Sequence, residues 1–166
     1  MDSSEKEKQT RQYDVLADKF REIYLAGKER SREAMDVALS KAREELTRLG
    51  EFGVEQGDQL TRYLERDMDQ TMQDMHKLGE EAKERFNPSR LGAGALASLA
   101  AALEYTSEAL HSMSSKTKEA LTYHTGEITS AGTLTCRACG QEIHLKNTGH
   151  VPPCPKCAGT VFDKGY

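Results

Sequence analysis

Four cysteines, arranged as two Cys-x-x-Cys pairs, constrain this chain more than any other feature. Cys136 and Cys139 form the first pair, Cys154 and Cys157 form the second, and the chain has no further cysteine. Two cysteines three residues apart in a tight turn can direct both sulfurs at one ion, and a second such turn completes a tetrahedron. The spacing therefore predicts a metal site in which all four ligands are thiolates.

Zinc is the metal that we expect at this site, and its role there should be structural. Four protein ligands leave no coordination position for water or substrate. Iron is the competing metal, because four thiolates also hold a redox-active iron. Disulfides are disfavoured because the charged start of the chain, Met1 to Lys6, is followed by no apolar run and therefore carries no secretory signal. We expect a cytoplasmic protein, whose thiols stay reduced.

Glycines and prolines divide the part of the chain that precedes the cysteines. Helix-forming residues, with apolar side chains at three- and four-residue steps, fill three segments, about residues 4–49, 54–87 and 90–121. Gly50, Gly53 and Gly57 separate the first two segments, and Pro88 separates the second from the third. Charged residues interrupt the apolar stripe of the first segment around Lys28, where we expect a stutter or bend within one long helix.

Residues after about position 125 have the composition of short strands. Threonine, glycine and β-branched residues replace the helix formers there. Glu142 to Leu145 should form a strand that reverses at Asn147 to Gly149, and Thr160 to Phe162 should form another. A module of this size buries little apolar surface, and structural zinc contributes on the order of 10 kcal/mol to folding in such cases.

The cysteine module is similar to a zinc ribbon over residues 133–157. Gly126-Glu127, His144-Leu145 and the run Pro152-Pro153-Cys154-Pro155-Lys156-Cys157 resemble, more narrowly, the YbeL-type family of bacterial zinc-ribbon-containing proteins. This resemblance implies a long charged helical region before a C-terminal ribbon, with the four cysteines as metal ligands, and it implies no reaction. Ala158 stands where glycine is common at the second Cys-x-x-Cys turn, a departure that Gly159 should absorb.

These observations together predict a mainly α protein. Residues 1–124 should form a long antiparallel helical coiled coil or three-helix bundle, and residues 125–166 a small C-terminal β zinc ribbon. The narrow apolar stripes suit packing within one chain or a homo-oligomer formed through the helices. The apolar block from Leu91 to Leu103 is too short to cross a bilayer, so we expect no membrane contact.

We expect a zinc-binding adaptor or interaction protein rather than an enzyme. The chain offers no Ser-His-Asp set, phosphate-binding loop or paired-carboxylate pocket. The ribbon should bind a protein partner through exposed strand edges and the side chains between its cysteine turns. Four such side chains are Arg137, Lys146, His150 and Lys156.

Two alternatives stay open. The ribbon could bind nucleic acid as a regulatory protein, although a net charge of -4 is the opposite of what phosphate binding favours. Iron in place of zinc would give a rubredoxin-like electron carrier. A di-iron site is disfavoured, because Glu108 and His111 form a single Glu-x-x-His unit where two are needed. The stripe of Met68, Met72 and Met75 is better explained as core packing than as a soft metal site.

Overall fold

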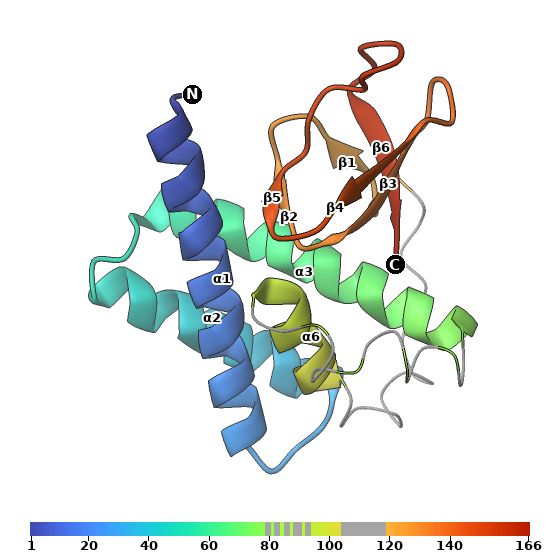
Figure 1. Ribbon diagram of the computed structural model, residues 1–166. Coiled ribbons are helices and arrows are strands. Elements are labelled where there is room, and N and C mark those ends of the chain that lie inside the picture. Colours follow the sequence, from blue (N-terminus) through green and yellow to red (C-terminus); the bar gives the residue numbers. More distant parts are fainter. Residues whose placement is uncertain (79–80, 82–83, 85–86, 88–90, 92–93, 104–118) are drawn as a thin grey trace.

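Helices precede strands along the chain, as the sequence predicts. The computed structural model describes residues 1–166 except 79–80, 82–83, 85–86, 88–90, 92–93 and 104–118 (Figure 1). The helices within the described residues are α1 (Ser3–Ala26), α2 (Arg32–Arg48), α3 (Val54–Leu78) and α6 (Ala95–Leu103). The strands are β1 (Tyr123–His124), β2 (Ile128–Thr129), β3 (Gly132–Cys136), β4 (Glu142–Leu145), β5 (Gly149–His150) and β6 (Val161–Gly165).

The single helix expected over residues 4–49 is wrong, because the chain turns between α1 and α2. The guanidinium of Arg30 donates to the carbonyls of Tyr24 and Gly27 at 3.0 and 2.9 Å, so it satisfies carbonyls at the end of α1. The Ser31 hydroxyl accepts a backbone N–H from the first turn of α2 at 3.1 Å. Local capping therefore ends one helix and begins the next where the sequence predicts only a bend.

The other two expected helices are covered in part. Within 54–87, α3 runs from Val54 to Leu78, and within 90–121, α6 occupies Ala95–Leu103. The Asp14 carboxylate of α1 accepts the backbone N–H of Ala95 at 2.8 Å, so a side chain from another helix satisfies a donor at the start of α6. Residues 119–121 form a turn rather than the end of a helix. Glu108 and His111 lie outside the described residues.

One apolar core unites the helices. Its buried residues include Leu16, Phe20, Leu39 and Leu64 from the first three helices. The methionine stripe belongs to it, since Met68 and Met72 are buried and Met75 packs against the cluster, which confirms the core interpretation.

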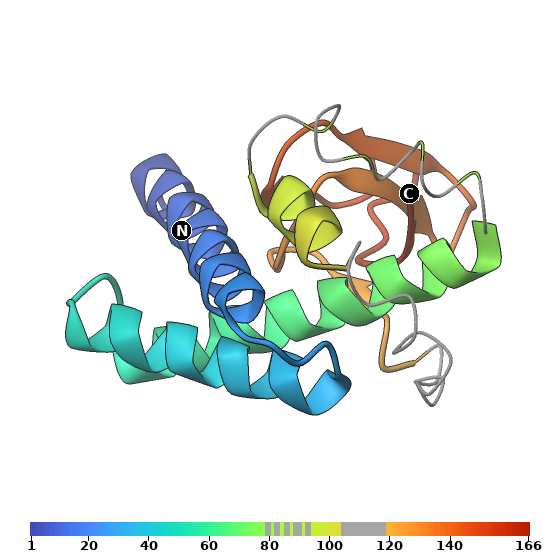
Figure 2. The same cartoon turned by 90° about the horizontal axis from the view of Figure 1, so that it is seen from below.

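Figures 1 and 2 both show α1 crossing α2 and α3 steeply, while α6 lies beside α1. Coiled-coil helices run nearly parallel, so the coiled-coil detail is not confirmed. No helix in the described part of the chain has the length and apolar character needed to cross a membrane.

Two small antiparallel sheets form the C-terminal part. The larger has the strand order β1-β6-β3-β4, and β2 pairs with β5 in the smaller one. In the larger sheet Cys136 lies opposite Phe162, and Leu134 lies opposite Lys164. A separate apolar cluster fills this part, made of Tyr123, Leu134, Cys136, Val151, Cys154 and Phe162. The sheet begins at Tyr123, just before the boundary expected at residue 125. The strands pack beside α1 and over α3 (Figures 1 and 2).

Candidate metal centre

The fold brings the four cysteine sulfurs into one cluster. All four Sγ atoms lie within 4.8 Å of one another. The Cys136 and Cys157 sulfurs are 3.7 Å apart, and the Cys139 and Cys154 sulfurs are 3.6 Å apart. Disulfide sulfurs are separated by about 2.05 Å, so these thiols are not bonded in pairs. A tetrahedron with metal–sulfur bonds of about 2.3 Å has edges of about 3.8 Å. The donor set and its spacing therefore fit a tetrahedral zinc or iron ion.

Two turns of the same design hold the sulfurs. In the first, the N–H of Gly140 donates to the Cys136 carbonyl at 2.8 Å, and in the second the N–H of Ala158 donates to the Cys154 carbonyl at 2.8 Å. Gly140 has a φ of 72° and Ala158 a φ of 57°, so both occupy the left-handed region. Glycine adopts this region freely, whereas an L side chain is strained there. The second turn thus keeps the geometry of the first in spite of its alanine.

Gly159 lets the two turns approach each other. A Cβ atom at this position would lie 3.0 Å from the Cys136 sulfur and 3.2 Å from the Cys157 sulfur. Contacts that short would force the sulfurs apart. Gly159 is therefore needed because a side chain there would clash with the sulfurs, whereas the strained backbone angle of this turn is at Ala158.

The thiols influence one another strongly. Burial raises the pKa of the Cys154 thiol, but the backbone N–H groups of Cys157 and Lys156 outweigh burial and lower it to about 7. The Gly159 N–H lowers the pKa of Cys157, but the neighbouring thiol of Cys139 and burial raise it to about 12. Once one thiolate forms, the next must ionise beside a negative charge. A bound cation relieves this repulsion, which is why metal affinity and thiol ionisation are linked.

The other side chains singled out in the sequence are not part of the sulfur cluster. Arg137 donates to the Asp163 carboxylate at 2.8 Å, so its charge is paired within the ribbon. Lys146 and Lys156 are exposed. The Nδ1 atom of His150 hydrogen-bonds the Gly126 carbonyl at 2.8 Å.

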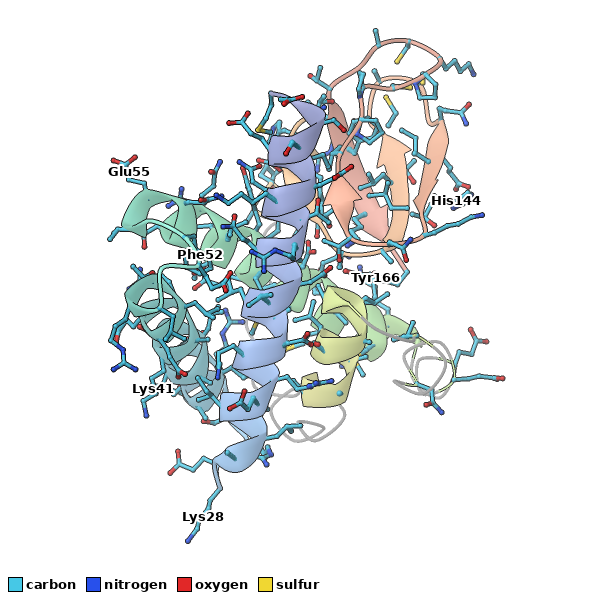
Figure 3. All side chains as sticks on the ribbon, turned by 60° about the vertical axis from the view of Figure 1, so that its left-hand side comes forward. Lys28, Lys41, Phe52, Glu55, His144 and Tyr166 are labelled. Atoms are coloured by element: carbon cyan, nitrogen blue, oxygen red, sulfur yellow. The ribbon has the colours of Figure 1, made fainter. Side chains whose placement is uncertain are left out.

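Sequence reasoning missed a buried polar cluster that joins the ribbon to the helices. Asp67 of α3 is fully buried and accepts from the Tyr13 hydroxyl at 2.6 Å and from the Ser130 N–H at 2.7 Å. The Lys164 ammonium lies 3.6 Å from the same carboxylate and donates to the Ser130 carbonyl at 2.9 Å. The Tyr166 hydroxyl is 3.0 Å from that of Ser130, where ribbon and helices meet (Figure 3).

Charge and burial oppose each other in this cluster. Burial raises the pKa of Asp67, but Lys164 and Arg66 outweigh it, so the pKa lies below its usual 3.8. Burial lowers the pKa of Lys164 from 10.5 to about 8 although Asp67 raises it. Arg66 also pairs with Glu127 of the ribbon and lies 3.9 Å from the centre of the Tyr123 ring. The only advance signal was a run of carboxylates on an otherwise apolar stripe of α3.

A family model described as a zinc-ribbon containing domain matches residues 24–165. The chain belongs to this family. The match spans α2, α3 and the whole ribbon, so family membership covers the helices together with the cysteine turns. It supports a zinc-ribbon family and does not single out the YbeL-type proteins. No curated protein and no solved structure matches the chain. Family and sulfur cluster together fit metal binding.

Proposed function

We propose that this zinc-ribbon protein binds one structural Zn²⁺ through Cys136, Cys139, Cys154 and Cys157 and acts as an adaptor that binds a protein partner. The ribbon presents the binding surface and the helices form the scaffold on which it is held. Four thiolates complete a tetrahedral shell, so no site is left for substrate, and the proposal includes no enzymatic activity. Thiols that lie 3.6 to 3.7 Å apart without bonding fit a reducing compartment such as the cytoplasm.

The closed sulfur cluster carries this proposal. Two turns of matching hydrogen bonds hold all four sulfurs at tetrahedral spacing, and membership of the family adds an independent reason for zinc. Iron fits four thiolates equally well by geometry, so the choice of zinc rests on the family. Metal analysis decides between them, because iron in four thiolates absorbs visible light and zinc does not.

The metal is tested on the intact chain purified without added metal. Elemental analysis should find one zinc per chain in the natural protein and none in a Cys139→Ser, Cys157→Ser double variant. A Ser3→Ala, Ser40→Ala variant, altered at two helix positions outside the cluster, is the matched control and should keep its zinc. A coloured protein with stoichiometric iron would replace the proposed metal, and zinc retained by the double cysteine variant would remove the site.

The partner is tested by affinity purification of the intact chain from a lysate of the cells that naturally produce it, followed by identification of the bound protein. Lys146 and Lys156 are exposed on the ribbon, so a Lys146→Ala, Lys156→Ala variant should keep its zinc and lose the captured protein. Capture that disappears after nuclease treatment, with affinity falling steeply as salt rises, would show a nucleic-acid-binding ribbon instead. Unchanged capture by the lysine variant would exclude Lys146 and Lys156 from the binding surface.

A further inference from the structure

Strand β4 forms one edge of the larger sheet of the ribbon. β4 is the last strand in the order β1-β6-β3-β4, and no described residue forms a strand against its outer side. Glu142, His144 and Lys146 alternate with half-buried residues and are exposed. Figure 3 shows His144 at the outer margin of the ribbon, turned away from the helices. An uncovered edge of this kind is a template for another strand.

The backbone register decides which groups of β4 are available. On the inner side, the Cys136 N–H donates to the Gln141 carbonyl at 2.9 Å. Backbone groups of successive residues point to opposite sides of a strand, so residues 141, 143 and 145 bond toward β3. Residues 142 and 144 therefore face outward, and Lys146 follows directly after β4 at a bend. The Glu142 carbonyl agrees with this, since it accepts from the exposed Gln141 amide at 2.9 Å, a local contact that an added strand can displace.

The outward residues are complementary to a second copy of themselves. In an antiparallel pair centred on His144, each Glu142 lies opposite the partner's Lys146, which places opposite charges side by side at both ends. Ile143 then lies opposite the partner's Leu145. Both side chains are half-buried against the ribbon core, so pairing covers their remaining apolar surface.

We propose that two copies of this chain associate through β4, antiparallel and centred on His144, so that two four-stranded sheets become one continuous sheet. The outward backbone groups of residues 142 and 144 supply the hydrogen bonds of this pairing, and Lys146, just after the strand, supplies the charge that meets Glu142. The inference goes beyond the proposed function, because it concerns self-association through the ribbon edge and needs neither the partner nor the helices.

Charge reversal on the metal-loaded, full-length chain tests this pairing. Sedimentation equilibrium should show a concentration-dependent dimer for the natural chain. Glu142→Lys or Lys146→Glu alone should weaken it by about tenfold or more, because each change replaces two attractive cross-strand pairs by two repulsive ones. An equimolar mixture of the two variants should form a heterodimer, since every Lys then lies opposite a Glu. Lys156→Glu, an exposed lysine away from β4, is the matched control and should not change the dimer.

Three results would overturn the pairing through β4. A natural chain that stays monomeric at millimolar concentration overturns the proposal, because the charged edge then only protects the sheet. A dimer that neither reversal weakens overturns it too and points to the helices. Weakening without restoration in the mixture shows that the pair is not antiparallel about His144. Zinc content is measured on every sample, so a monomer that keeps its zinc and its captured partner refutes the pairing and leaves the proposed function intact.

Discussion

Replacing Ala158 by glycine should stabilise this protein, although the change removes a methyl group. Ala158 has a φ of 57°, in the left-handed region, and its side chain is exposed. An L residue is strained there by roughly 1–2 kcal/mol. Glycine removes that strain but adds freedom to the unfolded chain worth about 0.5–1 kcal/mol. With the middle of each range, the net gain in unfolding free energy is about 0.75 kcal/mol.

Gly140 supplies the matched control, because it occupies the same place in the first turn. Its φ is 72°, and a Cβ atom added there would meet nothing within 4 Å. Gly140→Ala therefore changes only the backbone preference and should cost about 0.5–1 kcal/mol. The double variant, Gly140→Ala with Ala158→Gly, moves the strain from one turn to the other and should unfold like the natural chain, provided that the two sites are additive.

Thermal unfolding of the zinc-loaded chain measures these effects. For a chain of this size a gain of 0.5–1 kcal/mol raises the midpoint by about 1–4 °C. Ala158→Gly should rise and Gly140→Ala should fall by similar amounts, with zinc content unchanged in both. The reasoning is refuted if Ala158→Gly lowers the midpoint, or if both substitutions shift it in the same direction.

Asp67→Ala leaves the Lys164 ammonium buried without its carboxylate. The unfolding free energy measured by guanidinium titration should fall by about 3–5 kcal/mol, and a fall below 1 kcal/mol would contradict the buried pair. Lys164 has a pKa of about 8 when folded and 10.5 otherwise, so between pH 8 and 10 the unfolded chain binds more protons and stability rises with pH. Titrations at pH 7 and 9.5 should show this rise relative to Lys164→Met, and equal changes in both proteins would argue against it. Stripping the metal with a chelator should abolish hydrogen-exchange protection at Leu134 and Phe162 but not at Leu16 of α1, and protection kept at Leu134 would show a ribbon that folds without metal.

The ribbon was predictable because its signals are local. The sequence predicts a strand at Glu142 to Leu145 and another that includes Val161, and both are present as β4 and β6. Cysteine spacing alone pointed to one sulfur cluster, and the structure brings all four sulfurs within 4.8 Å of one another. Each strand and each Cys-x-x-Cys pair depends on residues within a few positions of one another, so a single sequence carries these signals.

The missed features depend on residues that are distant or that act as caps. Arg30 belongs to the charged stretch in which the sequence predicted only a bend, yet its guanidinium satisfies the carbonyls that end α1. Asp67 and Lys164 are far apart in the chain, so the sequence alone does not show that these two charges meet. A buried charge is tolerable only beside its partner, and no local pattern announces a partner that arrives from another part of the fold.

The strand β6 explains how the cysteine turns and the buried pair depend on each other. Cys136 lies opposite Phe162, and the N–H of Arg137 donates to the Val161 carbonyl at 3.0 Å, so the first cysteine turn fixes the register of β6. Side chains two residues apart share a face of a strand, so the register that buries Phe162 in the ribbon core also buries Lys164 against Asp67. A slip of one residue would turn Lys164 to solvent and leave the Asp67 carboxylate buried without it. An ion that holds the cysteine turn in place therefore stabilises the contact between ribbon and helices, at a distance from its own ligands.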